Sequence, residues 1–176
     1  SHEPAADARV FRTSGTTAHA RGAHPFADLE LYDRAAHSAA RYALFPDRPR
    51  MRLCILAPHE EELPDSSLSY MLARFTGWFG TAPAVYAWRD GKLQPDILIA
   101  ALEDAQRQAE PVALLGTSFA FVHAESALGT RRFELPAGSR IMQTGGFKGR
   151  SRSVEPAEML VLLEQRYATP RSHIVQ

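Results

Sequence analysis

The chain has 176 residues, of which 45% are hydrophobic, and this composition supports one domain with a substantial core. Lys and Arg together number 20, as do Asp and Glu, so the zero net charge excludes nucleic-acid binding driven by bulk charge. The single cysteine, Cys54, excludes an internal disulfide and a cysteine-based metal site. No apolar run could span a bilayer and no signal-peptide pattern is present, so we expect a cytoplasmic protein without a membrane span or a nucleic-acid partner.

The first residues stand apart from the rest of the chain. Ser1–Pro4 is typical of a cloning remnant, so we expect residues 1–9 to be a disordered or tag-flanked N-terminus. Residues 10–176 are then expected to form one α/β core.

Two kinds of segment follow one another along this core. In chain order, the periodicity predicts a helix over 28–44, a strand over 51–57, a helix over 66–79, a strand over 84–88 and a helix over 96–110. It then predicts strands over 112–115 and 140–143, a helix over 156–167 and a strand-like ending at 173–176. This alternation predicts a largely parallel sheet with helices on both faces. Ligands of such sheets bind beyond the carboxyl ends of the strands. Three segments with candidate binding residues each come directly after a predicted strand or short apolar stretch.

The first of these segments is rich in hydroxyl groups. It follows Val10 and Phe11 and comprises Thr13, Ser14, Gly15, Thr16 and Thr17, with Arg21 nearby. A glycine among hydroxyl donors lets the backbone approach a polyphosphate, and a basic residue would neutralise its charge. An ordinary turn has the same composition, so the segment by itself leaves both interpretations open.

The second segment, residues 115–123, carries a buried strand into Gly116, Ser118, Phe119, Phe121 and His123. We expect it to be a loop that passes a polar ligand while the two phenylalanines wall an apolar pocket. In the alternative, both phenylalanines belong to the core and the histidine is structural.

The third segment, residues 143–150, contains Gly145 and Gly146 followed by Lys148 and Arg150. Adjacent glycines after a strand favour close approach of a flat ring or a phosphate to the backbone. The alternative is a surface turn with solvated basic residues.

Several enzyme motifs are absent from the sequence: the P-loop lysine motif, the Gly-x-Gly-x-x-Gly fingerprint and the Gly-x-Ser-x-Gly elbow. The seven histidines show no metal-ligand spacing, so no protein metal site is predicted. The acidic run 59–62 could attract a cation, but we expect a solvated loop there.

Three stretches together resemble a known family. Residues 13–17 (TSGTT) are similar to the phosphate-binding loop of adenylate-forming enzymes, the acyl-CoA synthetase and luciferase superfamily. Residues 116–123 (GTSFAFVH) and 135–152 (LPAGSRIMQTGGFKGRSR) resemble the acyl-protein synthetases, the fatty-acid-activating subunits of bacterial bioluminescence operons. The resemblance extends from about Phe11 to Gln176.

This resemblance implies an acid–thiol ligase that uses ATP and Mg²⁺. The enzyme would convert a carboxylic acid, a fatty acid by the likeness, to an acyl-adenylate and transfer the acyl group to coenzyme A, a carrier protein or a protein cysteine. By similarity, the nucleotide-binding residues would be Thr13, Ser14, Gly15, Thr16, Thr17, Arg21, Gly145, Gly146 and Lys148. The substrate-binding residues would be Gly116, Ser118, Phe119, Phe121 and His123.

The sequence also departs from the family pattern. Residues 18–21 (AHAR) stand where the superfamily has a glycine and a lysine, so Arg21 would replace that lysine. The acidic Tyr-Gly-x-Thr-Glu motif and the lysine-bearing C-terminal domain would lie beyond Gln176, as would the catalytic residues. We therefore expect an incomplete N-terminal domain of the enzyme.

Two other functions remain open at this point. The chain could be a non-catalytic α/β module that serves in interaction or carrier docking. It could also be a phosphate-binding transferase of another α/β family.

Overall fold

The computed structural model describes residues 9–13, 22–145 and 154–176, and its centre is a five-stranded parallel sheet. The strands lie in the order β4-β3-β7-β8-β9. Their bounds are β3 (Arg52–Leu56), β4 (Val85–Tyr86), β7 (Val112–Thr117), β8 (Arg140–Thr144) and β9 (Ile174–Val175). The α/β class and the parallel sheet predicted from the alternation are confirmed.

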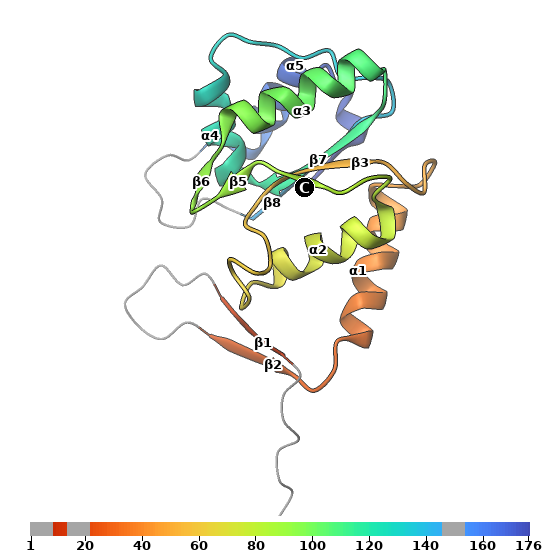
Figure 1. Ribbon diagram of the computed structural model, residues 1–176, viewed down its shortest axis with the longest axis vertical. Helices are drawn as coiled ribbons and strands as arrows, with labels where there is room; N and C mark the ends of the chain where they lie inside the picture. The colour runs from red at the N-terminus through yellow and green to blue at the C-terminus, as the bar shows by residue number, and fades with distance from the viewer. Residues whose placement is uncertain (1–8, 14–21, 146–153) are drawn as a thin grey trace, which may run out of the picture.

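Helices cover both faces of this sheet. Helices α1 (Glu30–Ala43) and α2 (Ser67–Phe79) lie on one face, and α3 (Pro95–Gln108), α4 (Ser118–Leu128) and α5 (Pro156–Tyr167) lie on the other (Figure 1). The four helices expected from the sequence lie within two residues of their predicted bounds. No described helix has the length and apolar character needed to cross a membrane.

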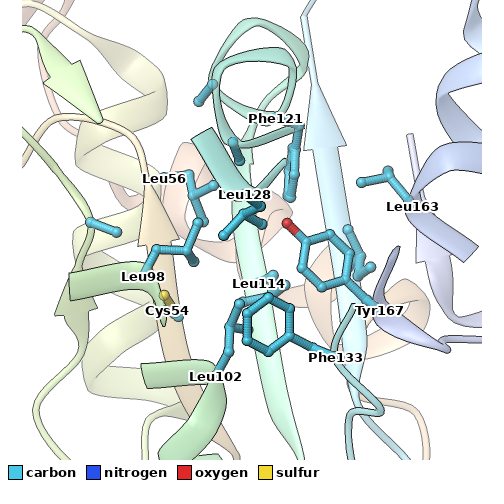
Figure 2. Close-up of a cluster of buried hydrophobic side chains, with 14 of the residues drawn as sticks. Cys54, Leu56, Leu98, Leu102, Leu114, Phe121, Leu128, Phe133, Leu163 and Tyr167 are labelled. Atoms are coloured by element: carbon cyan, nitrogen blue, oxygen red, sulfur yellow. The ribbon is translucent and has the colours of Figure 1, made fainter. Parts of the chain in front are cut away.

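The two faces hold separate hydrophobic cores because successive strand side chains point in opposite directions. On β3, Leu53 and Ile55 join the core under α1 and α2, whereas Cys54 and Leu56 join the core under α3, α4 and α5. The second core also contains Leu114 of β7 and Tyr167 of α5 (Figure 2). Burial on both faces explains why these strands read as continuous apolar runs rather than alternating ones.

The direction of strand addition reverses once along the chain. From β3 the chain passes through α2 to β4 on one side, and then returns through α3 to β7 on the other side of β3. Because crossovers between parallel strands keep one hand, the reversal places α2 and α3 on opposite faces. The topological switch point therefore lies between β3 and β7, where sheets of this type bind ligands.

Two antiparallel hairpins lie outside the sheet. The first pairs β1 (Arg9–Arg12) with β2 (Ala23–Phe26), and the second pairs β5 (Trp88–Arg89) with β6 (Lys92–Leu93). The second hairpin turns through Asp90 and Gly91, both with positive φ. The strand predicted over 84–88 is therefore two short strands, β4 and β5, rather than one.

The loop expected over 115–123 is also wrong, because β7 runs to Thr117 and α4 begins at Ser118. The Thr117 hydroxyl caps this helix by accepting a hydrogen bond from the Ala120 amide at 3.1 Å. Phe121, Ala124 and Leu128 recur at helical spacing and face the core, and no glycine interrupts them before Gly129.

Candidate functional site

The candidate site lies along the carboxyl edge of the sheet, where β7 and β8 bring predicted residues together. Ser118, the first residue of α4, is 5% exposed. Its hydroxyl contacts the side-chain amide of Gln143 and donates to the carbonyl oxygen of Gly145 at 2.6 Å. Ser118 and Gly145, 27 residues apart, therefore meet, and the serine hydroxyl is occupied within the protein.

Gln143 was not singled out by the sequence analysis as a functional residue. It lies near the carboxyl end of β8, is 6% exposed, and pairs in register with Gly116 of β7. A polar residue that follows the apolar pair Ile141 and Met142, two positions before a glycine pair, is the signal that could have identified it.

The two described glycines of the predicted site have different roles. Gly145 has φ +79°, and a Cβ at this position would meet no atom within 4 Å, so the backbone conformation is what favours glycine there. A Cβ on Gly116 would lie 2.8 Å from both Cβ and the carbonyl oxygen of Leu56. Gly116 thus allows β3 and β7 to pack closely. This packing by itself explains why a glycine is required at position 116.

An aromatic group borders the same edge. Phe119 of α4 packs against His123 at 4.4 Å between ring centroids and against Trp88 of β5 at 5.9 Å. Trp88, which is 7% exposed and belongs to the core, also contacts His123 at 5.9 Å, so it supports the Phe119–His123 pair from beneath. His123 is exposed and Phe119 is partly buried, whereas Phe121 is fully buried in the core under α4. The core interpretation therefore holds for Phe121, which exposes no surface to a ligand.

The β1–β2 hairpin lies beside the connection that follows β3. The Arg12 amide donates to the carbonyl oxygen of Asp65 at 2.8 Å. At the end of the hairpin, the Thr13 amide donates to the Gly22 carbonyl oxygen, and the Gly22 amide donates to Thr13 Oγ1, both at 2.9 Å. Thr13 therefore closes the hairpin with its own side chain.

The predicted nucleotide-binding residues divide into those that the structure describes and those outside its described ranges. Thr13 and Gly145 belong to the part of the chain that the structure describes. The following lie outside the described residues: Ser14, Gly15, Thr16, Thr17, Arg21, Gly146 and Lys148.

The acidic run after β3 differs from the solvated loop expected there. The Glu60 carboxylate binds Arg9 at 3.2 Å and Arg74 at 2.9 Å, and Glu62 accepts a hydrogen bond from the Asp90 amide at 3.2 Å. Glu61, with its side chain 88% exposed, and Glu62 are both exposed as expected, whereas the Glu60 side chain is only 20% exposed. Residues 60 and 62 thus connect the β3–α2 segment to both hairpins.

Tyr86, at the end of β4, lies beside this acidic run with its ring centroid 4.8 Å from that of His59. Burial, followed by the charge of Glu60, raises the pKa of the Tyr86 hydroxyl to about 12. This hydroxyl is neutral at physiological pH and has no hydrogen-bond partner among the described residues.

No three His, Cys, Asp or Glu side chains within residues 9–13, 22–145 and 154–176 are grouped closely enough to hold a metal ion. The described part of the edge supplies the Ser118 and Gln143 side chains, aromatic surface and the paired charges of Glu60, Arg9 and Arg74.

An open depression of about 720 Å³ lies at the opposite, amino edge of the sheet. It is lined by Arg48, Gln106, Gln108, Ala109, Glu110, Pro111, Glu134, Pro136 and Ala137. None of the predicted site residues borders it, and it lies away from the topological switch point. The carboxyl edge is therefore the better candidate site.

Comparisons with protein-family models, curated proteins and solved structures find no match to this chain. The functional assignment consequently depends on the residues and their geometry.

Proposed function

We propose that this chain is the nucleotide-binding core of an enzyme that activates a carboxylic acid, a fatty acid by its sequence likeness, as an acyl-adenylate. The observation that carries the proposal is the meeting of Ser118 and Gly145 at the carboxyl edge, one strand away from the switch point between β3 and β7. Ligand sites of doubly wound sheets occur at this edge. The β1–β2 hairpin, which leads into the hydroxyl-rich residues 14–17, is attached to the same edge through Asp65.

In the proposed reaction, a carboxylate oxygen of the acid attacks the α-phosphorus of ATP, and the bond to pyrophosphate breaks. A thiol of coenzyme A, a carrier protein or a protein cysteine then attacks the acyl carbon and releases AMP. Such chemistry requires positioning and charge neutralisation more than a covalent contribution from the protein.

The described residues fit parts of this task. The hydroxyl of Ser118 holds the Gly145 turn at the end of β8, where a flat ring or ribose would approach the backbone. Phe119 and His123, supported by the buried Trp88, offer an aromatic face against which an acyl or aryl group would pack. By the sequence likeness, Thr16 and Lys148, which lie outside the described residues, would donate to the phosphates.

Isothermal titration of the chain with Mg-ATP, AMP and a non-hydrolysable acyl-adenylate mimic tests the proposal. We expect the mimic to bind most tightly, because it combines the contacts of the nucleotide and the acid. The variants Thr16→Ala and Gly146→Val should lose this binding, whereas Glu61→Gln should retain it because that side chain is exposed. Equal or absent binding of all three ligands would refute the assignment.

A non-catalytic docking module is the competing function. It predicts binding to a carrier protein that neither the adenylate mimic nor Thr16→Ala affects. A pull-down with a purified acyl carrier protein, with and without the mimic, therefore separates the two functions.

A further inference from the structure

Glu60 occupies a central position at the carboxyl edge. It lies in the connection from β3 to α2, and its side chain is 20% exposed. Its Oε2 accepts from Arg9 Nη1 of β1 at 3.2 Å, and its Oε1 accepts from Arg74 Nη2 of α2 at 2.9 Å. Both carboxylate oxygens are therefore bound, each by a different element.

An aromatic ring completes this arrangement. The guanidinium carbons of Arg9 and Arg74 lie over the Tyr70 ring, 4.7 Å and 5.1 Å from its centroid. Two like charges over one ring repel each other, and the shared carboxylate of Glu60 compensates for that repulsion. The Tyr70 hydroxyl donates to Asp33 Oδ2 at 3.2 Å, which orients the ring against α1.

The remaining donors of Arg9 also bind the connection after β3. Its Nε and Nη2 donate to the carbonyl oxygen of Pro64 at 3.2 Å and 2.9 Å. Arg9 therefore binds the connection at two points, the Pro64 carbonyl and the Glu60 carboxylate. A fork-shaped guanidinium held at two points defines the direction of its strand as well as its position.

The hairpin has a second, apolar attachment. Phe11 of β1 packs with Phe26 of β2, Tyr32 of α1 and Tyr70 of α2, at centroid distances of 5.4, 5.7 and 5.5 Å. Apolar burial is non-directional, so this packing keeps the hairpin attached without fixing its orientation. The charge-assisted bonds of Glu60 are directional and, together with the Arg12 amide bond to the Asp65 carbonyl oxygen at 2.8 Å, supply what the packing lacks.

We propose that Glu60 is a positioning residue that sets the orientation of the β1–β2 hairpin relative to the carboxyl edge, and thereby the affinity for the nucleotide phosphates. This inference rests on the proposed function. Glu60 itself touches no ligand in this proposal and acts through Arg9.

The test compares Glu60→Gln with Glu61→Gln, which makes the same substitution at the neighbouring, exposed side chain. We expect Glu60→Gln to raise the Kd for Mg-ATP about tenfold, the scale of a lost charge-assisted contact. Glu61→Gln should stay within about twofold of the unaltered chain. Glu60→Asp, which retains the charge on a shorter side chain, should recover part of the affinity.

Hydrogen exchange supplies a readout that needs no ligand. Glu60→Gln should speed exchange of the Arg12 and Thr13 amides, while amides of β3 and β7 keep the rate seen in Glu61→Gln. A uniform increase across the sheet would indicate a merely stabilising role and overturn the proposal. If Glu60→Gln fails to fold, Arg9→Gln removes the same contact from the hairpin side and is judged by the same two measurements.

The outcomes distinguish the two proposals. If the unaltered chain binds Mg-ATP and the Glu60 and Glu61 variants bind it equally well, positioning by Glu60 is wrong and the proposed function stands. If the unaltered chain binds neither Mg-ATP nor the adenylate mimic, the proposed function is wrong and the role of Glu60 in it falls as well.

Discussion

The hydroxyl of Ser118 donates to the carbonyl oxygen of Gly145 at 2.6 Å and joins the first residue of α4 to the end of β8. The same hydroxyl contacts Gln143, so one small buried side chain holds the ends of two neighbouring strands together. The turn at Gly145 therefore depends on a serine 27 residues earlier in the chain.

Replacement of Ser118 by alanine should lower the free energy of unfolding by about 1–3 kcal/mol, because buried partners lose their hydrogen bond. Ser126→Ala is the matched control, since this serine lies on the same helix but is exposed, and it donates to the Val122 carbonyl oxygen at 3.2 Å. Its effect should stay below about 0.5 kcal/mol. Urea unfolding measures both, and equal effects would show that the Ser118 contacts contribute no stability.

Two glycines should respond in opposite ways to alanine. Gly116→Ala would place a Cβ 2.8 Å from Leu56, so we expect a loss of about 1–3 kcal/mol from overpacking. Gly77→Ala lies within α2 with no atom within 4 Å of the new Cβ, and it should gain up to about 1 kcal/mol from helix propensity. Thermal unfolding of both variants checks the prediction, and a stabilised Gly116→Ala would contradict the close packing of β3 and β7.

The hydroxyl of Tyr167 is buried in the core and has no hydrogen-bond partner within the described ranges (Figure 2). Burial raises the pKa of this hydroxyl, so it stays neutral. Tyr167→Phe should therefore leave stability unchanged or raise it by about 1 kcal/mol, because an unsatisfied polar group is removed. Tyr70→Phe, which breaks the bond to Asp33, should instead destabilise the chain. The denaturant midpoints of the two variants measure these changes in stability. A lower midpoint for Tyr167→Phe would reveal a hydrogen-bond partner for the Tyr167 hydroxyl.

Alkaline pH should weaken the fold through buried thiol and phenol groups, which include Cys54, Tyr86 and Tyr167. Burial raises the pKa of the Cys54 thiol from 9.0 to about 12, and burial with the charge of Glu60 raises that of Tyr86 from 10.0 to about 12. Between the ordinary pKa of each group and its raised pKa in the fold, the unfolded chain has released a proton that the folded chain still holds. The free energy of unfolding therefore falls as the pH rises from about 9 to 12. Urea unfolding at increasing pH measures this slope.

Cys54→Ala provides the control for the alkaline effect. It should make the slope shallower, because the thiol then no longer contributes. The thiol itself should resist alkylation in the folded chain and react on unfolding. Rapid labelling of Cys54 under native conditions would contradict its burial.

The sequence predicted the main elements because their signals are local. Apolar runs at 51–57 and 112–115 and the helical period at 156–167 can be recognised within single segments, and each corresponds to a strand or helix. The segment 115–123 was misjudged because Gly116, Thr117 and Ser118 are typical of a loop, whereas Thr117 in fact caps a helix. The residue types that cap helices also occur in turns, and only the packing of Phe121 into the core shows that a helix follows Thr117.

The candidate site was predicted only in part. The sequence indicated Ser118 and Gly145 separately, and the structure brings them into contact. It gave no sign that Glu60 differs from Glu61, because adjacent glutamates look alike until the elements around them are placed. Their difference arises from Arg9, 51 residues earlier in the chain, and from Arg74 on the next helix.

By itself, the amino-acid sequence determined that this protein is an α/β domain with a parallel sheet and helices on both faces, because hydrophobic periodicity is written into each short segment. Only the tertiary structure decided the strand order, the attachment of the β1–β2 hairpin and the sharing of Glu60 between two arginines. These features arise from contacts between residues far apart in the chain, which no local pattern specifies.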